Sequence, residues 1–183
     1  KSGSVYGLDP DTGEILWSTV VSGGGTQGGI HFGMAAEGKT VYVPINDMKN
    51  TYDGKVWQNR KPGMHSLDAE TGNILWSNIT NKECKEIDFN CDPGVSAAVT
   101  AIPGAVIVGH LDGNIRIYDK KNGNIIWTYN SLKDFDSISG TPASGGSFSG
   151  SGPSVRNGHM AINSGYGIYN HMPGNALLLF SVD

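Results

Sequence analysis

One pattern recurs three times along the chain: an aspartate, a glycine four residues later and a tryptophan four residues after that. The copies align without gaps as VYGLDPDTGEILW, MHSLDAETGNILW and IRIYDKKNGNIIW. Their residues are Asp9-Gly13-Trp17, Asp68-Gly72-Trp76 and Asp119-Gly123-Trp127. A fourth copy begins at ALLLFSVD, and the aspartates lie about 50 to 65 residues apart. Matched copies at near-regular spacing predict a repeat architecture.

Each copy has the features of a β-hairpin. A short apolar strand precedes the aspartate, whose side chain can accept hydrogen bonds from the backbone N–H groups that follow and so fix a turn. The glycine supplies the left-handed conformation that closes the hairpin. The tryptophan then lies on the second strand, where we expect it to be buried between neighbouring sheets.

Two further strands are expected between successive hairpins. The candidates are residues 29–35 and 40–45, 95–102 and 105–109, and 153–156 and 159–163. Four strands in 50 to 60 residues is typical of a propeller blade. The sequence therefore predicts an all-β fold: residues 1–183 form a partial β-propeller domain of about three four-stranded antiparallel blades, with an incomplete fourth hairpin at 175–183. The small residues 94–100 (GVSAAVT) suit an innermost strand crowded around the propeller axis.

The composition excludes some partners. The chain has 27 glycines and is 38% hydrophobic, which favours short strands and tight turns over long amphipathic helices. Its net charge of -4 argues against nucleic acid, which requires a concentrated basic face. No run of about 18 apolar residues is present, so we expect no membrane span. The five histidines are scattered and form no metal-ligand pair.

The two cysteines, Cys84 and Cys91, are separated by six residues. A zinc site would need more ligands at shorter spacing. We expect a local disulfide, with two unrelated free thiols as the alternative, because a gap of this length closes easily in an oxidising compartment. Asn78, in the sequon Asn78-Ile79-Thr80, is a candidate glycosylation site. Both features favour a secreted or periplasmic protein.

The D-x-x-T-G-x-x-x-W hairpin resembles the repeat of PQQ-dependent (quinoprotein) dehydrogenases and related propellers. The stretches GGIHFGMAAEGKTVYVPIND, CDPGVSAAVTAIPGAVIVGHLDGNIRIYD and NSGYGIYNHMPGNALLLFSVD look like the polyvinyl-alcohol dehydrogenase-like branch. The G-H…W-D and kelch patterns are missing from all copies. The resemblance implies oxidation of an alcohol by hydride transfer to a calcium-bound PQQ, with an aspartate as base and an external electron acceptor. No C-x-x-C-H motif is present, so a haem partner would lie outside this chain.

The resemblance also points to individual residues. Related enzymes have a Gly-Gly-x-x-Trp segment whose tryptophan forms the floor under PQQ, and here the better register places Phe32 there. The calcium-binding asparagine at the end of the next strand corresponds to Asp47, with Asn46 adjacent. The catalytic aspartate corresponds to Asp88 in the segment EIDF, and Asp92 is a second candidate.

Structural roles are the alternatives for these residues. Asp47 could form a turn, Asp88 could be a solvated loop residue, and Phe32 could belong to the core.

Three function classes follow: a quinoprotein alcohol dehydrogenase, a secreted non-catalytic propeller that binds partners or has a structural role, and an assembly scaffold of the outer-membrane type. The scaffold is the weakest of the three, because the stretches around Cys84 and NSGYG resemble the dehydrogenase branch.

Three blades cannot close a ring, because propellers start at about four. An open arc would expose apolar blade faces, which a soluble monomer rarely tolerates. We therefore expect the arc to be completed by more chain or by another subunit, which would share any active site.

Overall fold

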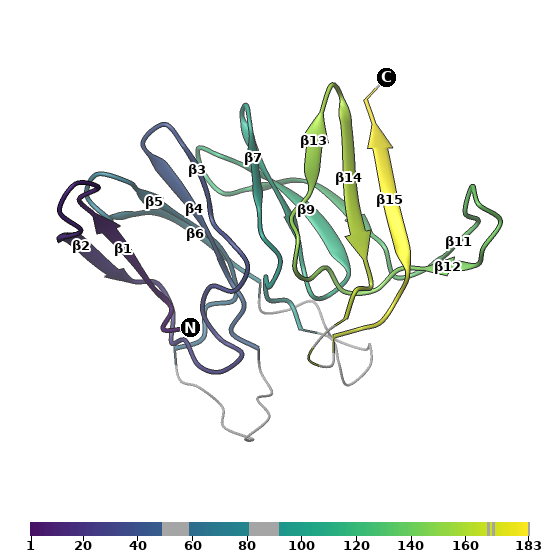
Figure 1. Ribbon diagram of the computed structural model, residues 1–183, viewed down its shortest axis with the longest axis horizontal. Coiled ribbons are helices and arrows are strands. Elements are labelled where there is room, and N and C mark those ends of the chain that lie inside the picture. Colours follow the sequence, from purple (N-terminus) through teal and green to yellow (C-terminus); the bar gives the residue numbers. More distant parts are fainter. Residues whose placement is uncertain (49–58, 81–91, 168, 170, 183) are drawn as a thin grey trace.

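The computed structural model describes residues 1–48, 59–80, 92–167, 169 and 171–182. All of its regular elements are β-strands, and the sheets stand side by side in an arc (Figure 1). Among the described residues, no helix is long and apolar enough to cross a membrane. The all-β prediction is confirmed.

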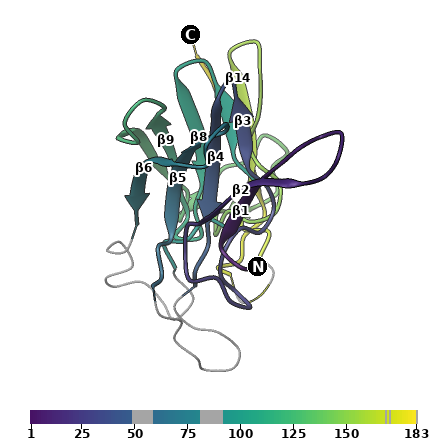
Figure 2. The same ribbon diagram turned by 90° about the vertical axis from the view of Figure 1, so that its left-hand side faces the viewer.

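In the described part of the chain the strands form five antiparallel sheets, of which two have the four strands of a complete blade. Blade 1 is the pair β1–β2, blade 2 is β3–β6, blade 3 is β7–β10 and blade 4 is β13–β15; β11 and β12 pair in a separate hairpin that extends away from the blades (Figure 1). Figure 2 shows β6, β5, β4 and β3 in that order across blade 2. The strands are β1 Ser4–Leu8, β2 Ile15–Val20, β3 Ala35–Glu37, β4 Thr40–Ile45, β5 Gly63–Asp68, β6 Ile74–Ile79, β7 Thr100–Ile102, β8 Ala105–Gly109, β9 Asn114–Asp119, β10 Ile125–Asn130, β11 Asp134–Phe135, β12 Ala143–Ser144, β13 Ser154–Arg156, β14 His159–Ser164 and β15 Ala176–Ser181.

The repeated hairpins form as the sequence predicts. Asp68 Oδ1 accepts hydrogen bonds from the backbone N–H of Glu70 at 2.9 Å and of Thr71 at 2.8 Å. Gly72 follows in the left-handed region with φ of 73°. The aspartates and glycines of the first and third hairpins have the same kinds of contact and the same sign of φ.

The cores lie between blades. One contains Tyr42 and Met64 of blade 2 with Val106 and Tyr118 of blade 3. A second joins blades 1 and 2, and a third joins blades 3 and 4. Each blade therefore depends on its neighbour to bury its apolar face.

The tryptophans differ in burial. Trp76 is buried, Trp17 is partly buried, and Trp127 is 38% exposed. The prediction that every repeat tryptophan is buried is wrong for Trp127. Trp17 and Trp76 lie over the glycine in the turn of the following hairpin, whereas Trp127 lies edge-on to Phe180 of β15, with ring centroids 5.8 Å apart.

The innermost segments are paired differently from the prediction. Strand pairing begins only at Ala35 in blade 2 and Thr100 in blade 3. Residues 94–99 instead make backbone hydrogen bonds to other blades, such as Val95 N–H to the Ile45 carbonyl at 3.0 Å. In residues 29–34, the Gly29 carbonyl accepts a hydrogen bond from Asn46 N–H of the same blade at 2.9 Å. A Cβ at Gly94 would lie 2.1 Å from the Asn46 carbonyl oxygen, so this close approach requires glycine.

Candidate functional site

Phe32 lies at an open pocket of about 440 Å³ where the inner segments of blades 2 and 4 meet. Its side chain is 48% exposed, and Tyr166, which also lines the pocket, is 68% exposed. The other lining residues are small or polar: Ser149, Gly150, Ser151, Asn163, Gly165, Gly167 and Gly174. The hydroxyl of Ser149 is buried and has no hydrogen-bond partner among the described residues. The pocket can thus offer two aromatic surfaces and several hydroxyl and amide groups to a ligand.

His31 precedes Phe32, and both of its ring nitrogens make polar contacts. Its Nε2 lies 3.2 Å from the Gly28 carbonyl and its Nδ1 lies 3.1 Å from Ser96 Oγ. Because a carbonyl only accepts, Nε2 carries the proton and Nδ1 accepts from the serine hydroxyl. Burial, assisted by the nearby charge of Lys1, lowers the pKa of His31 to about 4, so the ring is neutral at pH 7.

Asn46 is fully buried at the end of β4. Its Nδ2 donates to the Gln27 carbonyl at 2.9 Å, while its Oδ1 has no hydrogen-bond partner among the described residues. Gln27 Oε1 is buried in the same unpaired state. Buried acceptors are normally satisfied, so Asn46 Oδ1 is an exception among the described residues.

Asp47 is buried and adopts the left-handed conformation, with φ of 41°. Its Oδ1 accepts hydrogen bonds from Gly29 N–H at 2.7 Å and Ser22 Oγ at 3.2 Å, and its Oδ2 accepts from Lys61 N–H at 2.9 Å. The carboxylate therefore joins three segments of the chain. This geometry favours a structural role, and a part in metal binding stays a prediction.

Arg60 connects Asp47 to Asp92. Its Nε donates to the Asp47 backbone carbonyl at 2.6 Å, and its Nη2 contacts the same oxygen. The Nη2 atom also lies 3.6 Å from Asp92 Oδ2. Asp92 is 4% exposed, and its Oδ1 accepts from Gly94 N–H at 3.0 Å. The structure thus brings two of the predicted site residues into one cluster through an arginine.

Three predicted residues, Asp88, Cys84 and Cys91, lie outside the described residues. The sequon residue Asn78 is on β6, where its Nδ2 donates to the Gly123 carbonyl of blade 3 at 2.8 Å. Its use as a glycosylation site stays a prediction.

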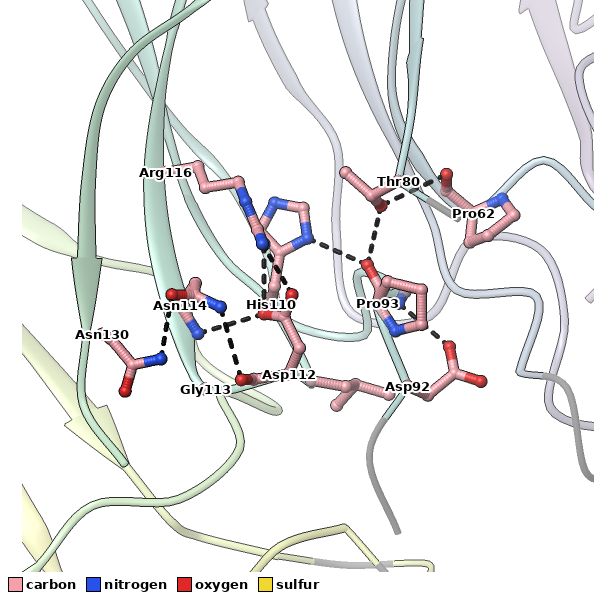
Figure 3. Close-up of polar contacts among 12 residues, drawn as sticks. Pro62, Thr80, Asp92, Pro93, His110, Asp112, Gly113, Asn114, Arg116 and Asn130 are labelled. Carbon is pink, nitrogen blue, oxygen red and sulfur yellow. Dashed lines mark hydrogen bonds and ion pairs between the residues drawn. The ribbon is translucent and has the colours of Figure 1, made fainter. Parts of the chain in front are cut away.

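A buried polar network in blade 3 lies beside Asp92 (Figure 3). Arg116 forms an ion pair with Asp112, with Nη2 and Oδ2 2.6 Å apart. His110 lies between the Pro93 carbonyl and the Tyr118 hydroxyl. These residues, like Arg60 and Tyr166, were not predicted from the sequence. Tyr166 belongs to the NSGYG stretch that carries the family resemblance, which was the one available signal.

Known proteins with similar sequences cover the whole chain. A polyvinylalcohol dehydrogenase from Pseudomonas sp is 37% identical over 194 residues, which covers 100% of this chain and 29% of that protein. A polyvinylalcohol dehydrogenase from Sphingopyxis sp. is 34% identical over 196 residues, with the same coverage. The chain thus spans well under half the length of these relatives.

Solved structures support the fold. BamB from Moraxella catarrhalis superposes with a TM-score of 0.58 at 19% identity, covering 99% of this chain and 41% of that chain. A europium-containing methanol dehydrogenase superposes with a TM-score of 0.58 at 18% identity, covering 88% of this chain and 31% of that chain. At these identities the likeness concerns the propeller fold alone.

A family model, PQQ_2, described as "Outer membrane protein assembly factor BamB", matches residues 1–165. With the repeated hairpins, the blade architecture and the polyvinylalcohol dehydrogenase relatives, this match confirms the resemblance to quinoprotein dehydrogenase-like propellers. The chain belongs to the PQQ_2 family of PQQ-repeat β-propellers.

Proposed function

We propose that the protein containing this chain is a quinoprotein alcohol dehydrogenase and that these blades form part of its active site. The observation that carries the proposal is the open pocket between Phe32 and Tyr166, lined by hydroxyl groups and an amide. An aromatic pocket with a few convergent polar groups is typical of a cofactor site. The polyvinylalcohol dehydrogenase relatives support the same reaction class.

The pocket suits the chemistry of PQQ, which is a flat quinone with three carboxylates. Phe32 and Tyr166 would contact its ring faces, and the Ser149 hydroxyl, the Ser151 hydroxyl and the Asn163 amide would hydrogen-bond its oxygen atoms. The buried, unpaired Ser149 hydroxyl is the observation that fits a polar ligand here.

The described residues fit a calcium ion less well than they fit PQQ. No group of three or more His, Cys, Asp or Glu side chains in the described part of the chain could hold a metal ion. Both carboxylate oxygens of Asp47 accept hydrogen bonds, which leaves Asn46 Oδ1 as the unpaired buried oxygen of the predicted pair. The described residues do not build a calcium site by themselves, and we assign no step to a metal ion.

The chain's own residues would handle the alcohol proton. When bound, the quinone supplies an acceptor for the hydride that leaves the carbinol carbon. Asp92 is the candidate base in the described residues and would take the hydroxyl proton as the carbonyl forms. Arg60 holds this carboxylate at 3.6 Å and supplies its counter-charge. Asp88 stays the alternative base.

The names of the relatives support the proposed substrate class. We propose an alcohol as the substrate, with hydroxylated polymers such as polyvinyl alcohol as the first class to test, because the pocket is open and two relatives are named for that substrate. We also propose that further blades complete the propeller, that electrons pass to an external acceptor, and that the protein is secreted or periplasmic.

The test is alcohol-dependent reduction of an artificial dye by the full-length protein supplied with PQQ and calcium. Polyvinyl alcohol and 1-butanol serve as substrates, and Asp134→Asn, an exposed aspartate in the β11–β12 hairpin, is the matched control for Asp92→Asn. We expect activity in the wild type and the control, and a loss of about 100-fold or more in kcat in Asp92→Asn. Activity that survives Asp92→Asn would move the base to Asp88.

A non-catalytic binding or structural propeller is the second candidate. The observation that favours it is the Asp47 carboxylate, which is fully used in joining chain segments. A full-length protein that binds no PQQ and oxidises no alcohol would support this second function.

A further inference from the structure

We infer that Thr80 and His110 are positioning residues that together fix the Pro93 carbonyl and thereby hold Asp92 against Arg60. The inference rests on the proposed function, because positioning Asp92 affects catalysis only if Asp92 acts as a base. Thr80 follows β6 of blade 2, and His110 follows β8 of blade 3.

Two side chains donate to the same carbonyl oxygen (Figure 3). Thr80 Oγ1 lies 2.8 Å from the Pro93 oxygen and His110 Nδ1 lies 3.0 Å from it. Because this carbonyl directly follows Asp92 in the chain, the two bonds restrict the backbone from which the carboxylate projects. Both side chains are buried, so water does not compete for the contacts.

Thr80 also reaches the loop that carries Arg60. Its backbone N–H donates to the Pro62 carbonyl at 2.9 Å, two residues after Arg60. Its hydroxyl donates to the Pro93 carbonyl, one residue after Asp92. One residue therefore ties together the two loops whose side chains form the Arg60–Asp92 ion pair.

His110 is locked in a single tautomer. Its Nδ1 donates to the Pro93 carbonyl, so its Nε2 accepts from the Tyr118 hydroxyl at 2.9 Å. Full burial, assisted by the charge of Arg116, lowers the pKa of His110 to about 3. The neutral ring thus keeps its donor directed at Pro93 across the ordinary pH range.

The experiment compares Thr80→Val with Thr100→Val in the full-length protein. Thr100 Oγ1 donates to the Pro153 carbonyl at 2.5 Å, so its variant removes the same kind of bond away from Asp92. Thr80→Ser keeps the hydroxyl and is the rescue variant. The proteins should be produced in a host without N-glycosylation, because Thr80→Val also removes the sequon of Asn78.

We expect kcat to fall about 10- to 100-fold in Thr80→Val with KM unchanged, since a small displacement of a reacting group has this effect. Thr100→Val and Thr80→Ser should retain wild-type kcat. His110→Gln, which retains a donor, should lose less activity than His110→Phe. Equal kcat in Thr80→Val and Thr100→Val would overturn the inference.

A crystal structure of the Thr80→Val protein gives a readout that does not require activity. We expect Asp92 to lose its contact with Arg60 or with the Gly94 N–H, while the Thr100→Val structure keeps both. An unmoved Asp92 would overturn the inference even if the wild type oxidised alcohols. A displaced Asp92 in a protein that oxidises no alcohol would instead reject the proposed function and leave the positioning contact established.

Discussion

The indole ring of Trp76 packs over Gly123 of the next hairpin, and its N–H donates to the Lys120 carbonyl at 2.8 Å. Trp17 makes the same pair of contacts one blade earlier, over Gly72 and to the Ala69 carbonyl at 3.0 Å. The repeat therefore encodes the hairpin and also the joint between neighbouring blades.

Because Trp76 packs over Gly123, we expect a methyl group at Gly123 to lower the stability of the fold. A Cβ there would lie 2.4 Å from the Trp76 ring, and φ is 71°. Gly123→Ala should lower the free energy of unfolding by about 1 to 2 kcal/mol for the left-handed backbone and by about 1 to 3 kcal/mol more for overpacking. Gly104→Ala, with φ of 82° and no atom within 4 Å, should show only the backbone cost. Urea denaturation measures both, and equal losses would contradict the packing role of Trp76.

The buried ion pair between Asp112 and Arg116 of blade 3 should contribute to stability. Asp112→Asn removes the carboxylate charge that faces the buried Arg116 guanidinium at 2.6 Å and should lower the free energy of unfolding by about 3 to 5 kcal/mol. The double variant Asp112→Leu with Arg116→Met should recover most of that loss, because it removes both charges. Denaturation of the single and double variants measures the coupling energy between Asp112 and Arg116. A double variant that loses more stability than the single variant would argue against a coupled ion pair.

Acid should destabilise the protein through His110. Its pKa falls from 6.5 in the unfolded chain to about 3 in the folded state, mainly because of burial. The unfolded state therefore binds more protons between these values, and stability falls as the pH drops, by about 1.4 kcal/mol per pH unit. His110→Gln should reduce this slope, whereas His159→Gln, at an exposed position, should not. Parallel slopes in all three proteins would contradict the assignment.

The local features of the fold were predictable from the sequence. Each hairpin is encoded by its own residues, so the turn aspartate, the left-handed glycine and strands β4 and β8 agree with the predictions. The inner segments were harder to predict, because residues 94–99 make some of their backbone hydrogen bonds to other blades, as Val95 does to Ile45 and Ala98 does to Gly150. Their small size indicated crowding but gave no pairing partner.

The site was predictable only in part. Phe32 and Asp92 were identified by resemblance, and the structure places one at a pocket and the other in an ion pair. Tyr166, which shares the pocket with Phe32, and Arg60, which pairs with Asp92, could not be assigned from the sequence. Each lies far from its partner along the chain or comes from another blade, so the folded structure alone brings each pair together. The structural contacts of Asp47 were hidden for the same reason, since three separate segments supply them.

The disulfide between Cys84 and Cys91 stays a prediction. A thiol reagent should detect no free cysteine in the folded or denatured protein until it is reduced. A crystal structure should place the two sulfur atoms about 2 Å apart. Two titratable thiols in the denatured, unreduced protein would contradict the bond and weaken the proposed secreted or periplasmic location.

Binding of PQQ to the full-length protein tests the central claim most directly. Titration should give a measurable Kd in the wild type, an affinity about tenfold weaker in Phe32→Ala because the ring contact is lost, and retained affinity in Phe32→Trp. Phe135→Ala, in the β11–β12 hairpin, is the control and should bind as the wild type does. Failure of the wild type to bind PQQ, or equal affinity in Phe32→Ala, would contradict a quinone site at this pocket.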